Sequence, residues 1–345
     1  MQNFTNSQML LGVTTPSNEE FNQNRTTIDE AFNQLMMNNV SAPLIGALLL
    51  IMFSMGCTVD LNKLWALLKR PWGLAVGIVC QFGFMPLIAF TMAVSFKLKP
   101  APAIAVLVLG SCPGGTISNV MSYWTDGDMD LSVVMTLCST ILAIGFMPLS
   151  LSIYSTTLTQ EFNNSSNSTQ ASNIEVPYKQ IGMTLIALII PLSFGIFVKR
   201  KWPDGSKIIL KVGTGVGATV LIVLAVVISL LYRGSWNADL PLLIIGIINP
   251  LIGYVVGFIL AVILQQSWKR CRTIALETGA QSGHLCITIL MISFKQEELR
   301  SMFAYPLIYI CFQIFHGLMF VTAYQLYRRF KKPSAASMDS SQSVI

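Results

Sequence analysis

The sequence has little charge. Only 11% of its 345 residues are Asp, Glu, Lys or Arg, whereas 53% are hydrophobic. Soluble domains usually carry about 25% charged residues, so the composition excludes a soluble domain and predicts a polytopic membrane protein. The two histidines and seven cysteines show no spacing typical of a metal site or of a disulfide framework. The N-terminus lacks a basic region followed by an apolar core, so no cleaved signal peptide is expected.

The sequence also lacks the motifs of membrane enzymes and the charge pattern of nucleic-acid-binding proteins. The apolar runs contain no HExxH motif, paired aspartates or Ser/Lys dyad, so the chain is not expected to be an enzyme and no cofactor is expected. The net charge of +6 comes from short basic clusters scattered between apolar runs. These clusters indicate membrane topology, and no nucleic acid partner is expected.

Apolar runs long enough for helices of roughly 20 residues divide the chain. They lie at 40–58, 72–95, 102–124, 131–154, 178–198, 208–232, 240–264, 272–294 and 302–327. The sequence therefore predicts an all-α polytopic membrane protein with about nine transmembrane helices. We expect an extracellular polar tail over 1–38, a transmembrane domain over 39–328 and a cytoplasmic tail over 329–345.

Glycosylation signals and basic residues indicate the orientation. Asn-X-Ser/Thr acceptors occur in the N-terminal tail and before residue 178, at Asn3, Asn24, Asn163, Asn164 and Asn167. A glycosylated segment must face outward. Lys and Arg are concentrated in the opposite loops, such as 199–201 and 269–272, which the positive-inside rule assigns to the cytoplasm. We expect a multi-pass plasma-membrane protein with an extracellular N-terminus and a cytoplasmic C-terminus.

Two apolar runs are interrupted near their centres. The third contains Pro113 followed by two glycines, and the eighth contains Gly279 and Gly283. Proline and glycine weaken helices, although a packing kink is the alternative interpretation of Pro113. The two runs are five apart, so they cross the bilayer in opposite directions. This pattern indicates an inverted-repeat transporter in which two broken helices cross at the midplane.

Glu277 lies inside the eighth run. A carboxylate at bilayer depth is costly unless it is partnered, so it is a candidate ligand-binding group; structural pairing with a buried hydroxyl or amide is the alternative. Oxygen-bearing side chains are expected nearby from the two breaks and from the second and fourth runs: Thr116, Ser118, Asn119, Gln281, Gln81, Ser132 and Thr136. Such oxygen donors suit a small alkali cation. Half-helix N-termini favour an anionic substrate.

These residues predict sodium-coupled uptake of an organic anion, with a proton as the alternative coupling ion.

The acidic segment Asp126 to Asp130 lacks the later bidentate glutamate of a calcium loop. We expect it to form a tight turn before the fourth span, with Asp130 as the N-cap.

Several strings resemble, in order and spacing, the sodium/bile acid cotransporter family. They are MFSMGC (52–57), KRPWG (69–73), CPGGTISN (112–119), DGDMDLS (126–132), RCRT (270–273) and ETGAQ (277–281). The resemblance covers about residues 45–327. RGSWNADLPLL and QQSWKRCRTIALETGAQ are most similar to the branch called sodium-dependent organic anion transporter, which handles sulfated steroids. The resemblance implies import of steroid sulfates or conjugated bile acids by alternating access of a panel domain against a core domain.

The resemblance also implies two sodium sites, with the ions as co-substrates. One sodium would be bound by Ser118, Asn119, Ser132, Thr136 and Glu277. The other would be bound by Gln81, Glu277 and Gln281, with the backbone carbonyls of Thr278 and Ala280. Two sodium ions with one monovalent anion would make transport electrogenic.

Three residues match positions on the family's substrate path: Thr116, Ser282 and His284. Relatives usually have Asn at 282 and Gln at 284, so the substrate stays open between bile acids and steroid sulfates. Because histidine changes charge near neutral pH, His284 predicts pH-sensitive uptake.

Expected partners are an organic anion, sodium and membrane lipid, and a homo-oligomer is left open. The alternatives are a receptor that binds a steroid-like ligand without moving it, or a carrier of another organic anion.

Overall fold

The computed structural model describes residues 42–43, 45–69, 71–165, 176–231, 239–294 and 296–342. The chain divides at Pro43 into an N-terminal unit and a second unit, Leu44–Ile345, to which every element below belongs. The described residues form helices and no strand. This confirms the all-α prediction. The expected extracellular tail, 1–38, lies outside the described residues.

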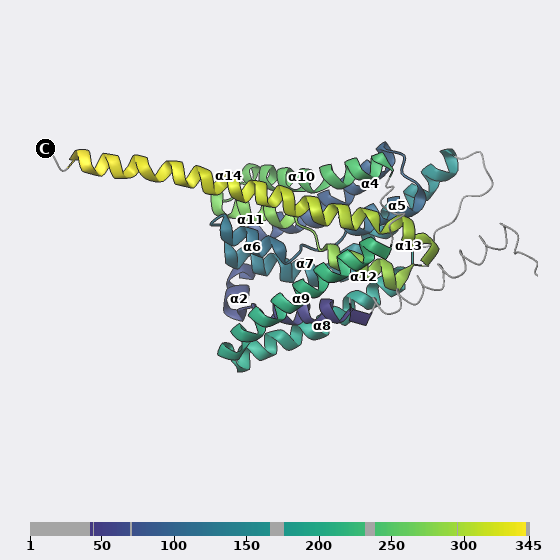
Figure 1. Cartoon of the computed structure of the whole chain (residues 1–345), viewed down its shortest axis with the longest axis horizontal. Coiled ribbons are helices and arrows are strands. Elements are labelled where there is room, and N and C mark those ends of the chain that lie inside the picture. Colours follow the sequence, from purple (N-terminus) through teal and green to yellow (C-terminus); the bar gives the residue numbers. More distant parts are fainter. Residues whose placement is uncertain are drawn as a thin grey trace, which may run out of the picture. The chain divides into compact units, whose positions relative to one another are not determined.

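The helices follow one another closely along the second unit (Figure 1). A first helix, Ile45–Gly56, bends by 76° into α2 (Leu61–Lys69). The remaining elements are α3 (Trp72–Val79), the π-helix η1 (Cys80–Phe84), α4 (Met85–Ser95), α5 (Pro100–Gly110), α6 (Ile117–Trp124), α7 (Met129–Ser165), α8 (Tyr178–Lys201), α9 (Pro203–Leu231), α10 (Leu240–Ile263), α11 (Trp268–Gly279), α12 (Gly283–Ser293), α13 (Gln296–Met302) and α14 (Ala304–Gln342).

Five helical segments of the described residues are long and apolar enough to cross a membrane: 72–95, 129–158, 178–201, 240–263 and 304–330. A sixth is added if the first helix and α2 are counted as one bent span. The third and eighth expected runs are each divided into two short helices, α5 with α6 and α11 with α12. The count of about nine spans and the inverted repeat stay predictions.

The second span widens into a π-helical turn at Cys80–Phe84. Pro86 follows two residues later, in the first turn of α4. Proline donates no backbone hydrogen bond and its ring clashes with the carbonyl of the residue four positions earlier, here Phe82. A π turn is one way for a helix to absorb this defect. The turn buries Gln81, which is 2% exposed.

The start of α7 differs from the sequence prediction. Asp128 caps it, because its Oδ1 accepts a hydrogen bond of 3.1 Å from the Leu131 backbone nitrogen. An N-cap side chain accepts from the second or third residue of the helix, and Leu131 stands three positions after Asp128. The prediction of Asp130 as the N-cap is therefore wrong. Its carboxylate instead forms an ion pair of 2.7 Å with Lys63 of α2.

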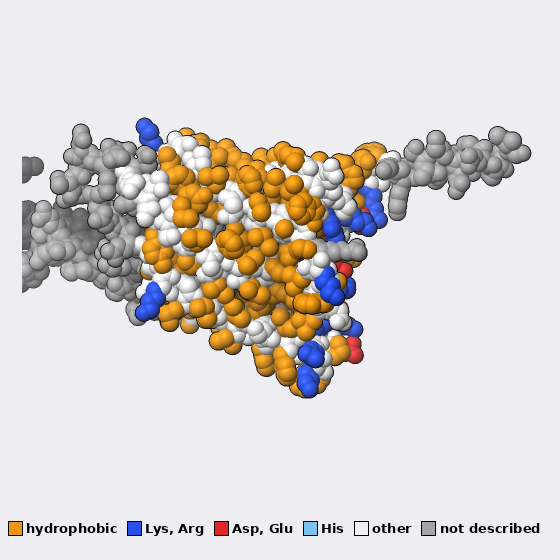
Figure 2. Space-filling model, turned by 180° about the vertical axis from the view of Figure 1, so that it is seen from behind, with side chains coloured by type: hydrophobic (Ala, Val, Ile, Leu, Met, Phe, Trp, Pro, Cys, Tyr) orange, Lys and Arg blue, Asp and Glu red, His pale blue; other side chains and the backbone are white. Residues whose placement is uncertain are grey.

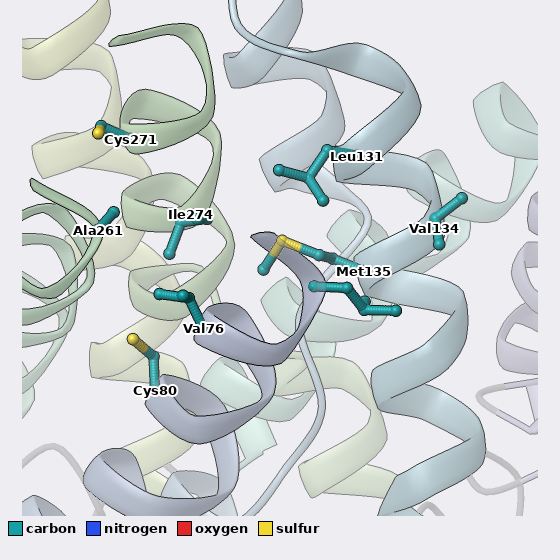
Figure 3. Packing of buried hydrophobic residues seen from close by; sticks show 9 residues of the cluster. Val76, Cys80, Leu131, Val134, Met135, Ala261, Cys271 and Ile274 are labelled. Carbon is teal, nitrogen blue, oxygen red and sulfur yellow. The ribbon is translucent and has the colours of Figure 1, made fainter. Parts of the chain in front are cut away.

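The divided helices lie among the long ones (Figure 1). α10 packs along α11 and α14, while α5 contacts α4, α7 and α13. Figure 3 shows an apolar cluster where α3, α7, α10 and α11 meet: Val76, Cys80, Leu131, Val134, Met135, Ala261, Cys271 and Ile274. Ile274 precedes Glu277 by about one helical turn. The cluster therefore supports α11 beside the candidate site.

The first helix, α8 and α9 form a second packing group. Gly56 and Gly195 meet so closely that a Cβ on Gly56 would lie 2.9 Å from the Cα of Gly195. α9 approaches the first helix through Gly217, where a Cβ would contact Ile51. This group touches the remaining helices through an apolar cluster of Met55, Val59, Leu137 and Leu192.

Basic side chains gather at the two ends of a broad apolar surface (Figure 2). They are denser at the end from which α14 extends. α2, the end of α8 and the start of α11 lie at this end (Figure 1). The exposed basic residues of these segments are Lys63, Lys69, Arg200, Lys201 and Lys269. We refer to this end as the basic end.

Candidate functional site

The two helix breaks pair with each other through their backbones. The Gly115 nitrogen donates to the Ala280 carbonyl at 2.7 Å, and the Ser282 nitrogen donates to the Pro113 carbonyl at 2.9 Å. Gly114 and Gln281 form an antiparallel β-bridge. Backbone groups released by a helix break must find partners inside a membrane protein. Here each break supplies partners for the other, so the broken helices cross at one defined point.

Glycine is required where the breaks approach each other. A Cβ on Gly115 would lie 2.8 Å from the Gln281 carbonyl oxygen, and one on Gly114 would collide with the Glu277 carboxylate. Neither space admits a side chain. The glycines that the sequence marks as weak points therefore also allow the backbone to approach the acid.

Glu277 is buried at this crossing and is 1% exposed. Its Oε2 accepts a hydrogen bond of 2.5 Å from Ser118 of α6, and its Oε1 accepts one of 2.5 Å from Thr136 of α7. No ion pair between described residues includes Glu277. A buried carboxylate is usually paired with a positive charge, but here only neutral hydroxyls face it.

Two more of the predicted ligands extend this network. Ser132 of α7 donates to the Asn119 Oδ1 of α6 at 2.7 Å. Ser132 stands one turn before Thr136 on α7, and Asn119 follows Ser118 on α6. The structure thus brings together all five residues predicted for the first sodium: Ser118, Asn119, Ser132, Thr136 and Glu277.

The two glutamines predicted for the second sodium, Gln81 and Gln281, meet at the end of α5. Gln81 Nε2 donates to the Cys112 carbonyl at 2.6 Å. The Gln281 amide, oriented so that its nitrogen donates, reaches the same carbonyl at 2.7 Å and the Leu109 carbonyl at 2.9 Å. Gln81 Oε1 is buried and has no hydrogen-bond partner in the described part of the chain. A buried acceptor without a donor is a suitable cation ligand.

The two backbone carbonyls predicted for this site belong to buried residues, Thr278 and Ala280. The Thr278 hydroxyl is used within α11, where it donates to the Ile274 carbonyl at 2.8 Å. The Ala280 carbonyl accepts from Gly115 and has a second lone pair. Cys112 is a residue that the sequence did not single out, although it precedes the PGG break directly and its carbonyl receives both glutamines.

Ser282 and His284 are in contact at the start of α12. The Ser282 Oγ lies 3.2 Å from the His284 Nε2. Thr288, one turn later, donates to the His284 carbonyl at 2.9 Å. Thr116, the third residue predicted for the substrate path, precedes α6 directly and is partly buried.

A cavity of about 250 Å³ lies between the first helix, α8 and α12. Its lining is mainly apolar: Ile45, Leu48, Leu49, Met183, Thr184, Ala187, Leu188, Thr288 and Ile292. His284, Thr288 and Ile292 are spaced four residues apart, so they share one face of α12. This face joins the helix break to the apolar cavity.

Polar contacts beyond the crossing join α11 to the turn between α6 and α7 and to α14. We call these contacts the clamp, and the sequence did not predict them. Arg272 of α11 donates to the Thr125 carbonyl at 2.8 Å and to the Asp126 carbonyl at 3.0 Å. The Thr273 hydroxyl accepts from the Asp128 backbone nitrogen at 2.8 Å. The helix that carries Glu277 therefore binds the turn between α6 and α7, which carry its hydroxyl partners.

Tyr324 and Arg328 of α14 complete the clamp. Asp126 has a positive φ of 49°, and its Oδ2 pairs with Arg328 at 2.8 Å and accepts from the Tyr324 hydroxyl at 3.1 Å. Arg272 also lies 4.6 Å above the Tyr324 ring. The signal in the sequence was the presence of DGDMD and RCRT in two loops expected on the same side.

The glycosylation predictions are not addressed by these contacts. Asn3, Asn24 and Asn167 lie outside the described residues, and the described side chains do not include Asn163 and Asn164 at the end of α7.

The chain is similar in sequence to known sodium-coupled transporters. The model of the Sodium Bile acid symporter family matches residues 45–236. The Sodium-dependent organic anion transporter of Homo sapiens is 50% identical over 296 residues, which cover 86% of this chain and 75% of that protein. The Ileal sodium/bile acid cotransporter of Oryctolagus cuniculus is 48% identical over 298 residues, covering 86% of this chain and 83% of that protein.

Proposed function

Because the chain belongs to the Sodium Bile acid symporter family, we propose that it imports amphipathic organic anions together with two sodium ions by alternating access. It is a multi-pass membrane transporter and not an enzyme. Its proposed substrates are steroid sulfates, conjugated bile acids or both. The observation that carries the proposal is the crossing itself, where a buried carboxylate faces only neutral oxygen groups.

A first sodium would neutralise Glu277. Ser118 and Thr136 each lie 2.5 Å from one carboxylate oxygen, and Asn119 and Ser132 extend the same network. Hydroxyl, amide and carboxylate oxygens are ligands of hard cations. A cation among them would supply the charge that the site lacks, with small rotations of the hydroxyls.

A second sodium would bind on the opposite side of Glu277. Its proposed ligands are the side-chain oxygens of Gln81 and Gln281 and the backbone carbonyls of Thr278 and Ala280. The unpartnered Oε1 of Gln81 supports this assignment. Glu277 would then be shared between the two ions, which would link their binding.

The organic anion would bind along the face of α12 that connects Ser282 and His284 with the apolar cavity. The N-terminus of α12 is the positive end of a helix dipole, which favours an anionic head, and the cavity accepts apolar surface. Thr116 lies at the start of the facing half-helix. Steroid sulfates come first among the proposed substrates because of the resemblance to the organic anion transporter branch. Proteins named Sodium-dependent organic anion transporter from four species are 48% to 50% identical to this chain.

The packing is compatible with a moving panel. The first helix, α8 and α9 are joined by close glycine contacts, whereas their interface with the remaining helices contains the apolar cluster of Met55, Val59, Leu137 and Leu192. Apolar contacts are non-directional and can slide. We assign the three helices to the panel and the crossing to the core.

The basic end is proposed to lie on the cytoplasmic side of the plasma membrane, since positive residues are retained on that side. The N-terminus and the glycosylation sites would then be extracellular. A homo-oligomer is left open.

Uptake of labelled estrone sulfate and of labelled taurocholate tests the function in cells that express the chain, with sodium or with choline in its place. Sodium-dependent accumulation of either compound is the expected result, and it identifies the preferred substrate. Binding that saturates at the amount of protein, with no accumulation in sealed vesicles, would identify a receptor instead. No uptake of either compound, with the protein at the surface, would contradict both proposed substrates.

A further inference from the structure

The helix α2 presents apolar side chains that the rest of the protein does not cover. Leu61, Trp65 and Leu68 are 41%, 62% and 42% exposed. Their spacing of four and three residues places them on one face. On the adjoining face, Leu64 and Leu67 pack against the cluster of Figure 3. α2 is thus fixed to the protein on one side and apolar on the side that faces away.

Lysines flank this outward apolar face. The Lys69 Nζ lies 5.7 Å from the centre of the Trp65 ring, and Lys63 pairs with Asp130 at 2.7 Å. A helix with Trp and Leu on one face and lysines beside it is typical of helices that lie in the plane of the membrane interface.

The position of α2 agrees with this orientation. Its axis turns by 76° from the first helix, so the two helices cannot both run along the membrane normal. Further exposed tryptophans lie at helix ends beside basic residues: Trp72 begins α3, Trp202 follows α8 and Trp268 begins α11, with exposed fractions of 61%, 68% and 68%. Tryptophans with basic neighbours mark the headgroup level of a membrane protein.

Chain connectivity keeps α2 at the membrane surface. Only the four residues 57–60 separate it from the first helix, and only residues 70 and 71 separate it from α3. A residue spans at most about 3.6 Å, so α2 cannot move far from the ends of these helices. The lipid surface is therefore the partner within reach of its outward face.

We propose that α2 and its lysines form a binding surface for the headgroups of anionic phospholipids. Leu61, Trp65 and Leu68 would enter the boundary between headgroups and acyl chains, and the lysines would bind the negative groups above them. Lys201 and Arg200 extend the positive charge, because α8 adjoins the end of the first helix at Gly195. Attraction between basic segments and anionic lipid falls off within a Debye length, so residues at this level contribute most.

Lys63 connects this surface to the site. Its partner Asp130 lies in the first turn of α7, two residues before Ser132. An anionic headgroup that binds Lys63 competes with Asp130. The lipid composition around α2 would in this way act on the helix that carries Ser132 and Thr136.

The test uses tryptophan fluorescence of the full chain in nanodiscs of phosphatidylcholine. A fixed minority of the lipid carries bromine on its acyl chains, as phosphatidylcholine in one sample and as phosphatidylserine in the other. The emission of Trp65 is obtained as the difference between the wild type and Trp65→Phe. We expect brominated phosphatidylserine to quench it about twice as strongly as brominated phosphatidylcholine, because anionic lipid is enriched around α2.

Lysine variants identify the cause of the enrichment. Lys63→Gln with Lys69→Gln should bring the two lipids to equal quenching. The matched control, Lys97→Gln with Lys99→Gln, removes two exposed lysines far from α2 in the chain and should keep the difference. Equal quenching in the wild type, a difference that survives Lys63→Gln with Lys69→Gln, or quenching of Trp65 by aqueous iodide and not by bromolipid would each overturn the proposal. The measurement needs no transport, so its outcome is independent of the proposed substrate.

Discussion

At the scale of single residues, Glu277 is the group on which the proposed sodium coupling depends most. Its two oxygens are held by hydroxyls from different helices, so its position is fixed before any ion binds. Hydroxyl groups can turn their lone pairs toward a cation and can also donate to a carboxylate. The same side chains can thus serve the empty and the occupied site.

Glu277→Gln should abolish sodium-stimulated uptake, with a loss of at least about 100-fold, which corresponds to removing one partner of a buried charge pair. Glutamine keeps the shape of the side chain, so surface expression should be unchanged. Asp239→Asn is the matched control, because Asp239 is exposed in an ion pair with Lys99. Sodium stimulation retained in Glu277→Gln would exclude the acid as a ligand.

Gln81→Ala should raise the sodium concentration for half-maximal uptake by about tenfold, the effect of losing one bond to a charged group. Its range of substrates should stay the same, since Gln81 contacts the break at Cys112. Gln313→Ala is the control, because Gln313 is also buried, at 4% exposure, but belongs to α14. A sodium titration that does not shift relative to this control would remove Gln81 from the site.

The position of His284 argues against the pH-sensitive uptake that the histidine predicts. Burial disfavours the charged form of an imidazole, so His284 at the start of α12 should stay neutral between about pH 8 and about pH 5.5. Uptake of an organic anion should therefore change little over this range, and His284→Gln should leave the pH profile unchanged, whereas Ser282→Asn should change the preference between estrone sulfate and taurocholate. Uptake that rises as the pH falls in the wild type but not in His284→Gln would show that the histidine takes up a proton.

At the scale of elements, the break between α5 and α6 depends on the absence of a side chain. Gly114→Ala would drive a methyl group into the Glu277 carboxylate, so sodium-dependent uptake should fall below about a tenth of the wild-type level. Gly145→Ala has no heavy atom within 4 Å of the new Cβ and should leave uptake unchanged. Equal uptake by the two variants, at equal surface expression, would show that the crossing tolerates the displacement of Glu277.

Sequence patterns predicted the two broken helices but could not show how they pair. Pro113 and Gly279 mark where helices weaken, whereas the hydrogen bond from Gly115 to Ala280 joins segments that are distant in the chain. The π turn around Gln81 has only Pro86 as a local signal. The N-cap was assigned to the wrong aspartate, because aspartates alternate at positions 126, 128 and 130 around the start of α7 and only the geometry at Leu131 distinguishes Asp128 from Asp130.

The clamp between α11, the α6–α7 turn and α14 is another long-range feature. Arg328 is 202 positions from Asp126 in the sequence, yet they form an ion pair. Charge patterns indicate which loops face the same side of a membrane but not which charges pair. The clamp connects α11 and α14 to the turn between α6 and α7, so its geometry depends on the tertiary structure as a whole.

At the scale of the whole molecule, composition alone gave the class of protein. A chain with long apolar runs and few charges is expected to cross the membrane as helices, since every backbone group must be paired within the segment. The oxygen-bearing side chains of the candidate site were predicted from their positions in the apolar runs, whereas their division into two sodium sites came from resemblance. The structure brings these side chains to one crossing. Burial and unpartnered atoms, such as the Oε1 of Gln81, are visible only in three dimensions.

Import of two sodium ions with one monovalent anion moves one net charge, so the membrane potential contributes about 2.3 kcal/mol per 100 mV. Uptake into proteoliposomes should increase when a potassium gradient with valinomycin makes the interior negative. It should decrease when the gradient is reversed at the same sodium gradient. Uptake that does not respond to the potential would indicate an electroneutral ratio of ions to substrate.

The backbone pairing at the crossing also affects how this transporter can evolve. The bonds of Gly115 and Ser282 use main-chain groups, so a side-chain exchange at position 282 does not delete them. We call the backbone pairing of the two breaks the joint. Serine can occupy position 282 without loss of the joint, so substitutions there can change substrate preference while the fold is retained. A conventional alanine scan will underestimate the joint for the same reason. Replacing the amide of Ser282 by an ester would remove its donor and expose the contribution of the joint directly.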